Sequence, residues 1–289
     1  MNRAFQFFCV GAQKAGTSTL HDIIQQNPSI NLPKRKETHF FRDDDKYAQG
    51  LDYYFKLFEK KKNCDNYGEI DPEYLYFEKC AQRILETFQH VKIVLLLRDP
   101  IDRAYSHYLM TKSRGHETLS FEEAISSEGE RLKTHFDHIN YSYIARGKYN
   151  TQIERYEQLF GKQQVAVFLF DDFVATPEKV VTEIANFVGL PSFDYDFSLK
   201  SNVAAEPKSE KIRDFVYKPN RFKKWVGKLI PSKQLKNDIM AAIVARNKKK
   251  LNKIPLSTEV KRKIYKEHFE AEIETLEVRL GRSLEAWKL

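Results

Sequence analysis

A lysine, three hydroxyl side chains and two glycines lie close together near the start of the chain, in Gly11-Ala12-Gln13-Lys14-Ala15-Gly16-Thr17-Ser18-Thr19. Glycines and small residues let backbone N–H groups converge, and such a loop at the start of a helix attracts an anion. Lys14 adds a charge that can neutralise a phosphate or a leaving group. The anion-binding residues predicted here are Lys14, Ala15, Gly16, Thr17, Ser18 and Thr19. The alternative is an ordinary turn with one exposed lysine.

The flanking residues predict the elements that position this loop. Residues 5–10 form an apolar run typical of a buried strand, and Leu20, Ile23 and Ile24 have helical spacing. The two glycines have the spacing of the nucleotide-binding P-loop, G-x-x-x-x-G-K-[ST]. However, Thr17 occupies the position of the P-loop lysine, and the lysine of this chain lies inside the loop as Lys14.

A second anion site is predicted after the most apolar stretch of the chain. Residues 91–97 read as a central parallel strand, and Arg98 follows at the carboxyl end, where open α/β sheets bind ligands. Asp99 is placed to cap the next helix and Pro100 to occupy its first turn. That helix carries Ser106. An arginine beside a hydroxyl suits a bidentate grip on phosphate, so we expect Arg98 and Ser106 to act together.

Composition narrows the possible classes of protein. The chain has 289 residues, 42% of them hydrophobic, and a net charge of +8, which suits an anionic ligand. Three cysteines without C-x-x-C spacing favour a reducing compartment and no metal site. No membrane span, secretory signal or nucleic-acid-binding motif is evident. We therefore expect a cytoplasmic, soluble protein without a membrane anchor or nucleic-acid partner.

The rest of the chain predicts further helices and strands. Residues 149–160 read as a helix and 165–170 as a strand, whereas 114–140 are polar and read as an irregular insertion. Beyond Pro191 lysines and prolines become frequent. Residues 258–280 predict one long helix, and Lys248-Lys249-Lys250 a solvated face. The fold predicted is a single α/β domain over 1–289, with a P-loop-like parallel sheet flanked by helices over 1–200 and a helical extension over 207–289.

Three ordered motifs resemble sulfotransferases that use 3′-phosphoadenosine 5′-phosphosulfate (PAPS). The segment 11–18 resembles the 5′-phosphosulfate loop of that family, and Leu97-Arg98-Asp99-Pro100 with Ser106 resembles its 3′-phosphate motif. Lys36-Glu37-Thr38-His39-Phe40-Phe41 is similar to the glutamate-bearing segment of the heparan sulfate, or glycosaminoglycan, type. The chain differs from that family at two places. Glu69-Ile70-Asp71-Pro72 replaces a Glu-Lys-Ser-Pro pattern. The Gly-Arg loop that often completes the 3′-phosphate site is not evident around residues 200–209, where Lys208 is the substitute.

The resemblance implies transfer of a sulfuryl group from PAPS to an acceptor hydroxyl, or an amine, of a carbohydrate, leaving adenosine 3′,5′-bisphosphate (PAP). It assigns Glu37 as the general base, His39 to orient or contact the acceptor, and Lys14 to stabilise the leaving phosphate. Glu69 and His39 are alternative bases. Two other functions stay open: a P-loop kinase or NTPase, and a non-catalytic protein that binds PAPS or anionic glycans.

Overall fold

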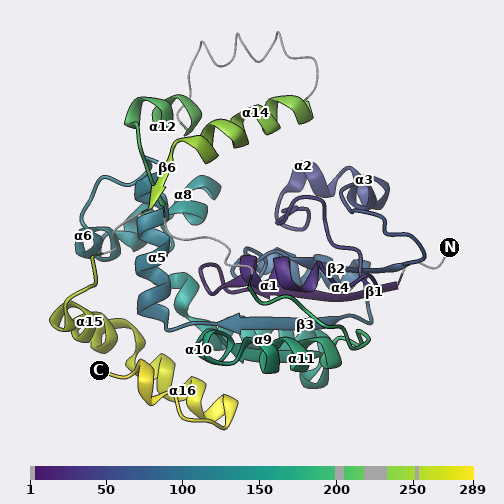
Figure 1. Ribbon diagram of the computed structural model, residues 1–289. Coiled ribbons are helices and arrows are strands. Elements are labelled where there is room, and N and C mark those ends of the chain that lie inside the picture. Colours follow the sequence, from purple (N-terminus) through teal and green to yellow (C-terminus); the bar gives the residue numbers. More distant parts are fainter. Residues whose placement is uncertain (1–3, 199–204, 218–232, 251–253) are drawn as a thin grey trace. The chain divides into compact units, whose positions relative to one another are not determined.

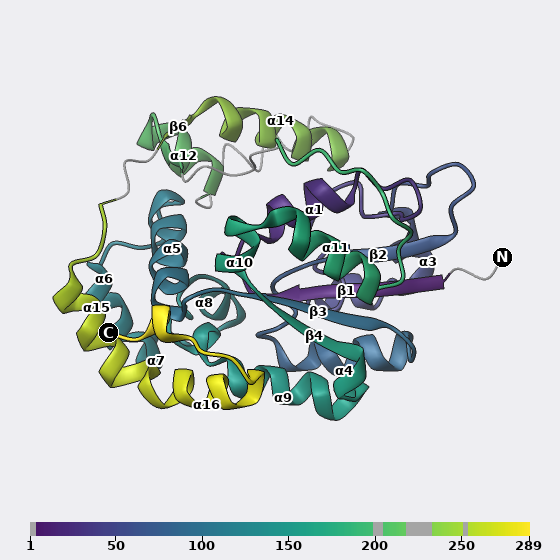
Figure 2. The ribbon, with the colours of Figure 1, turned by 60° about the horizontal axis from the view of Figure 1, so that its bottom comes forward.

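The computed structural model describes residues 4–198, 205–217, 233–250 and 254–289. Its main sheet has four parallel strands in the order β2-β1-β3-β4. Figure 1 shows β1, β2 and β3, and Figure 2 also shows β4 beside β3. The strands are β1 (Ala4–Gly11), β2 (Asn66–Ile70), β3 (Lys92–Leu97) and β4 (Val165–Leu169). The predicted strands at 5–10, 91–97 and 165–170 are therefore confirmed within one or two residues.

The chain divides into two compact units, and the sheet belongs to the first. The first unit holds described residues from 4–103, 145–198 and 258–289. Its helices are α1 (Thr17–Ile24), α2 (Asp44–Tyr47), α3 (Gly50–Lys56), α4 (Glu78–Thr87), α9 (Tyr149–Phe160), α10 (Phe170–Ala175), α11 (Pro177–Phe187), α15 (Thr258–Ile264) and α16 (Glu270–Leu280). Short turns of helix lie at Ala145–Gly147, Lys162–Gln164 and Glu285–Trp287. Helix α5 (Pro100–Ser113) begins in this unit and continues into the second.

Successive side chains of the buried strands point to opposite faces of the sheet, and both faces are apolar. Phe7 and Cys9 of β1 and Val94 and Leu96 of β3 share one core cluster with α1 and α11. On the opposite face, Phe8 of β1 is fully buried among aromatic rings. Because both faces are covered, the strands are nearly continuous apolar runs, as parallel strands usually are. The loops at their carboxyl ends are where open parallel sheets usually bind ligands.

The second unit contains residues 104–144 together with described residues from 205–217, 233–250 and 254–257. Its elements are α6 (Phe121–Ser126), α7 (Glu128–Arg131), α8 (His135–Asn140), β5 (Ala205–Pro207), α12 (Glu210–Tyr217), α14 (Lys233–Arg246) and β6 (Lys248–Lys250). The expectation that 114–140 is irregular was wrong. Capping boxes at Ser120 with Glu123 and at Thr134 with Asp137 start α6 and α8.

Lys248-Lys249-Lys250 forms β6, which pairs with β5 in an antiparallel ladder, and Lys249 is exposed, in agreement with the expected solvated face. One expectation for the C-terminal part needs correction. The helix expected over 258–280 is divided by a π-helical turn at Tyr265–Phe269, which separates α15 from α16. The predicted extent of one domain with a C-terminal extension stays a prediction, although α15 and α16 group with the first unit. Among the described residues, no helix has both the length and the apolar character needed to cross a membrane.

Candidate active site

The loop of Lys14 connects β1 to α1, as predicted. Gly16 precedes the helix with φ of 85°, a left-handed conformation that favours glycine, and Lys14 also has a positive φ of 73°. A Cβ on Gly16 would lie 2.8 Å from the ring of Phe170, so space as well as conformation requires glycine here. No side chain caps the start of α1. The first N–H groups of a helix lack intrahelical acceptors, so this loop can bind an anion through its backbone.

Arg98 lies beside this loop. It follows β3, and its Nη1 donates to the carbonyl oxygen of Lys14 at 3.2 Å. Its guanidinium lies 4.9 Å from the ring centre of Phe170, the residue that follows β4. The Tyr149 hydroxyl donates to the Arg98 carbonyl at 2.8 Å, which fixes the backbone. The two anion-binding elements predicted from the sequence, the loop and Arg98, are thus joined directly.

The start of the next helix is also as predicted. The Asp99 carboxylate accepts the N–H groups of Ile101 and Asp102, each at 2.8 Å, and Pro100 is the first residue of α5. Burial raises the pKa of Asp99 to about 6. This cap sets where α5 begins immediately after Arg98.

The segment with Glu37 and His39 lies between α1 and α2. Both residues have left-handed backbone conformations, with φ of 66° and 56°. Lys36 Nζ contacts a carboxylate oxygen of Glu37 at 2.5 Å and donates to the Thr17 hydroxyl at 3.4 Å. Glu37 therefore forms an ion pair with the neighbouring lysine. The same lysine also links Glu37 to the first residue of α1, which places the carboxylate near the anion loop.

A buried carboxylate near the carboxyl end of the edge strand holds this segment. Glu69 of β2 is fully buried, and its Oε1 accepts the Thr38 N–H at 3.1 Å and the Thr38 hydroxyl at 2.5 Å. The hydroxyls of Tyr74 and Tyr54 donate to the two oxygens at 3.2 and 2.6 Å. Burial, and then the charge of Asp71, raise the pKa of Glu69 to about 7. Because it is enclosed by these donors, Glu69 is a support of the segment rather than an exposed base.

A second carboxylate, Asp71, binds His39. Its Oδ2 accepts the backbone N–H of His39 at 2.8 Å and contacts Nδ1 of the ring at 2.9 Å. Sequence reasoning missed this residue, because Asp71 before Pro72 resembles an ordinary exposed turn. Its position in the sequence could have identified it. Asp71 directly follows β2, as Arg98 directly follows β3, so both residues lie at the carboxyl ends of parallel strands.

Glu73 braces the anion loop from the same turn. Its Oε1 accepts from the Gln13 side chain at 2.5 Å, and its Oε2 from Arg146 at 2.8 Å. Arg42 Nη1 also lies 3.5 Å from Oε2. Glu73 is buried, and two cations compensate the cost of burying its charge. The residues after β2 therefore support both the loop and the Glu37 segment.

Two predicted residues belong to the second unit. Ser106 is half-buried on α5, and Lys208 is exposed after β5, where its N–H donates to the Asn247 carbonyl at 2.7 Å. Their participation in the same site as Lys14 and Arg98 stays a prediction.

A model of the sulfotransferase domain family matches residues 5–236, most of the chain. The chain belongs to the sulfotransferase domain family. Human bifunctional heparan sulfate N-deacetylase/N-sulfotransferase 3 is 31% identical over 211 residues, which are 68% of this chain and 24% of that protein. Mouse heparan sulfate glucosamine 3-O-sulfotransferase 5 is 24% identical, over 67% of this chain and 56% of the relative. The chain thus spans about a quarter to just over half of these relatives.

A solved structure resembles this sulfotransferase domain over nearly its full length. The crystal structure of a sulfotransferase from Alicyclobacillus acidocaldarius has a TM-score of 0.71 and 27% identity, and the match covers 99% of both chains. The family and the parallel α/β fold inferred from the motifs are confirmed.

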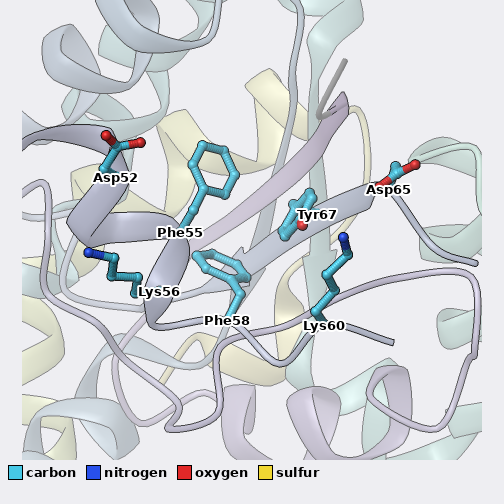
Figure 3. Close-up of a pocket in the computed structure, with 7 residues that line it drawn as sticks. All are labelled: Asp52, Phe55, Lys56, Phe58, Lys60, Asp65 and Tyr67. Carbon is cyan, nitrogen blue, oxygen red and sulfur yellow. The ribbon is translucent and has the colours of Figure 1, made fainter. Parts of the chain in front are cut away.

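A pocket of this sulfotransferase domain lies away from the residues described above. Figure 3 shows its aromatic wall, Phe55, Phe58 and Tyr67, with charged side chains around it; the charged lining residues are Asp52, Lys56, Lys60 and Asp65. Its volume is about 270 Å³. Tyr67 lies near the amino end of β2, whereas Glu69 and Asp71 lie at the carboxyl end. The pocket is therefore at the end of the strand where parallel sheets do not normally bind their ligands.

Proposed function

We propose that this sulfotransferase domain transfers a sulfuryl group from PAPS to a hydroxyl, or alternatively an amine, of a carbohydrate acceptor. The observation that carries the proposal is the contact between Arg98 and the carbonyl of Lys14 beside the uncapped start of α1. A donor with phosphates at both its 5′ and 3′ positions needs two anion sites close together. When bound, PAPS supplies the activated sulfuryl group.

The donor side is formed by the ends of β1 and β3. The loop N–H groups, with Thr17, Ser18 and Thr19, would hold the 5′-phosphosulfate, and Lys14 would stabilise the negative charge that develops on the leaving phosphate. Arg98 would hold the 3′-phosphate with Ser106, and Lys208 is a further candidate for that phosphate. The described residues fit this donor because the glycine-dependent loop and the guanidinium come from neighbouring parallel strands.

The acceptor side is formed by the segment between α1 and α2. Glu37 would take the proton from the acceptor hydroxyl, which is a poor nucleophile until that proton is withdrawn. His39 would contact or orient the acceptor. Lys36 contacts both Glu37 and Thr17, which supports a base that would lie near the group to be transferred. A carbohydrate acceptor is supported by the heparan sulfate sulfotransferases among the relatives.

The test is a product assay with intact protein, PAPS and EDTA. A panel of heparan-type oligosaccharides, phenols and steroids is supplied, and PAP and the sulfated product are measured by chromatography and mass spectrometry. We expect PAP to form together with sulfated saccharide. Sulfation of phenols alone would contradict the acceptor, and PAP affinity without turnover on any acceptor would indicate a binding protein.

The same assay tests the kinase or NTPase alternative, which membership of the sulfotransferase family disfavours. ATP with Mg²⁺ replaces PAPS in a parallel reaction. ATP consumption that depends on Mg²⁺, without PAPS turnover, would overturn the proposed donor.

A further inference from the structure

Asp71 is a carboxylate buried with a histidine as its ion-pair partner. Its side chain is 0% exposed, whereas that of His39 is 27% exposed. One oxygen of Asp71 binds both the N–H and the ring Nδ1 of His39, at 2.8 and 2.9 Å, while the other accepts the N–H of Glu73 at 3.1 Å. An ionised carboxylate only accepts hydrogen bonds, so Nδ1 of His39 carries a proton. The ring position and one proton are therefore fixed by Asp71.

The other ring nitrogen of His39 is available to a ligand. No hydrogen bond to Nε2 is formed within the part of the chain that the structure describes. Because Nδ1 is already protonated, Nε2 accepts a hydrogen bond when the ring is neutral and donates one when the ring is charged. The charge of the ring thus decides which kind of atom it can bind.

The surrounding charges favour the protonated ring. Burial lowers the pKa of His39, but the charge and hydrogen bond of Asp71 outweigh this and bring the pKa above its ordinary value. Arg42, in the same segment, opposes protonation, and Glu37 favours it. Arg42 is itself paired with Glu73, 3.5 Å away. On the other side of the pair, burial opposes ionisation of Asp71, and His39 nevertheless lowers the pKa of Asp71 to about 2.

We propose that Asp71 is a positioning residue that holds His39 as an imidazolium, whose Nε2–H binds an anionic oxygen of a reactant beside Glu37. The anionic oxygen belongs either to a carboxylate of the acceptor or to the sulfuryl group in transfer. The first choice gives His39 a role in acceptor binding, and the second a role in stabilising the transition state. This inference rests on the proposed function for the identity of the reactants, but the state of His39 can be measured without them.

The first experiment is an NMR titration of the eight histidines of the chain. His39→Gln assigns the signal, and the pKa of His39 is measured in the wild type and in Asp71→Asn. We expect a wild-type pKa above 6.5 and a lower one in Asp71→Asn. Asp22→Asn is the matched control: it removes the carboxylate 3.0 Å from the His21 ring and should leave the His39 titration unchanged.

The outcomes of this titration are decisive without enzyme turnover. A wild-type pKa below 6.5 overturns the proposal even if Asp71→Asn does not fold. The proposal is also overturned if His39 has the same pKa in the wild type and in a folded Asp71→Asn variant. A purely structural role for Asp71 would change stability without moving the titration of His39.

The second experiment separates the two sources of the anionic oxygen. Wild type and His39→Gln are compared on an N-acetylated heparan-type oligosaccharide that keeps its carboxylates and on its carboxyl-reduced form. A rise in KM of about 10-fold or more, on the carboxylated saccharide only, assigns the oxygen to the acceptor. A fall in kcat of about 10-fold or more on both saccharides assigns the anionic oxygen to the sulfuryl group. Unchanged KM and kcat would overturn the binding role of His39.

The second experiment also separates failure of this inference from failure of the proposed function. If the wild type sulfates neither saccharide, the proposed acceptor is wrong. The NMR titration still tests whether Asp71 holds His39 protonated.

Discussion

Replacing Glu69 by glutamine is expected to remove a pH dependence of stability that the buried carboxyl creates. The pKa of this carboxyl rises from 4.5 to about 7 in the folded protein. Between these values the folded state binds more protons than the unfolded state, so stability falls as pH rises. A pKa unit corresponds to about 1.36 kcal/mol, so the wild type should lose about 3 kcal/mol between pH 4.5 and 7.5 because of Glu69.

Urea unfolding followed by circular dichroism at several pH values measures this loss. Glu69→Gln cannot ionise, while its amide oxygen still accepts from Thr38 and its amide group can donate to Tyr54. His39 and Asp71 remain in both proteins, so the difference between the two pH profiles reports the titration of Glu69 together with its charge interaction with Asp71. Glu86→Gln, an exposed change on α4, serves as the control and should keep the wild-type profile. Parallel profiles for wild type and Glu69→Gln would refute the assignment of a raised pKa.

Three further changes test the donor and acceptor sides. Arg98→Ala should weaken PAP binding about 10- to 100-fold while affecting AMP much less, measured by calorimetry with the exposed Arg282→Ala as control. Glu37→Gln should slow turnover about 10²- to 10⁴-fold with PAP affinity nearly unchanged; near-normal turnover would transfer the role of base to another residue. Gly16→Ala should destabilise the fold by about 1–3 kcal/mol in urea unfolding. This loss in the free energy of unfolding should exceed that of Gly161→Ala, where φ is 82° but an added Cβ would meet no atom within 4 Å. Equal losses for the two variants would show that the contact with Phe170 does not matter.

The elements of the donor side were predictable because their signals are local. An apolar run that ends at Gly11 and a helical pattern from Thr17 identify a strand, a loop and a helix without any distant contact. Asp99 and Pro100 likewise mark the start of α5 after Arg98. Long, strongly patterned elements depend little on the rest of the chain.

The supports of the acceptor side were not predictable in the same way. Glu69 and Asp71 bind Thr38 and His39, about thirty positions earlier in the chain, and no local pattern specifies that pairing. Carboxylates near a proline suggest a solvated turn, although both are fully buried. By contrast, the helices within 114–140 were missed although their signal is local: Ser120 and Thr134 each precede an acidic residue by three positions.

The position of β2 at the edge of the sheet has a consequence for how the protein can diversify. In the proposed reaction, PAPS is held from the ends of β1 and β3, which each lie between two strands, while the acceptor segment is braced from the end of β2, whose one neighbouring strand in the described sheet is β1. A change at the end of an outer strand disturbs one ladder instead of two. The protein can therefore acquire new acceptors through substitutions after β2 while the inner strands keep the donor in place, so that the two halves of the reaction can evolve at different rates.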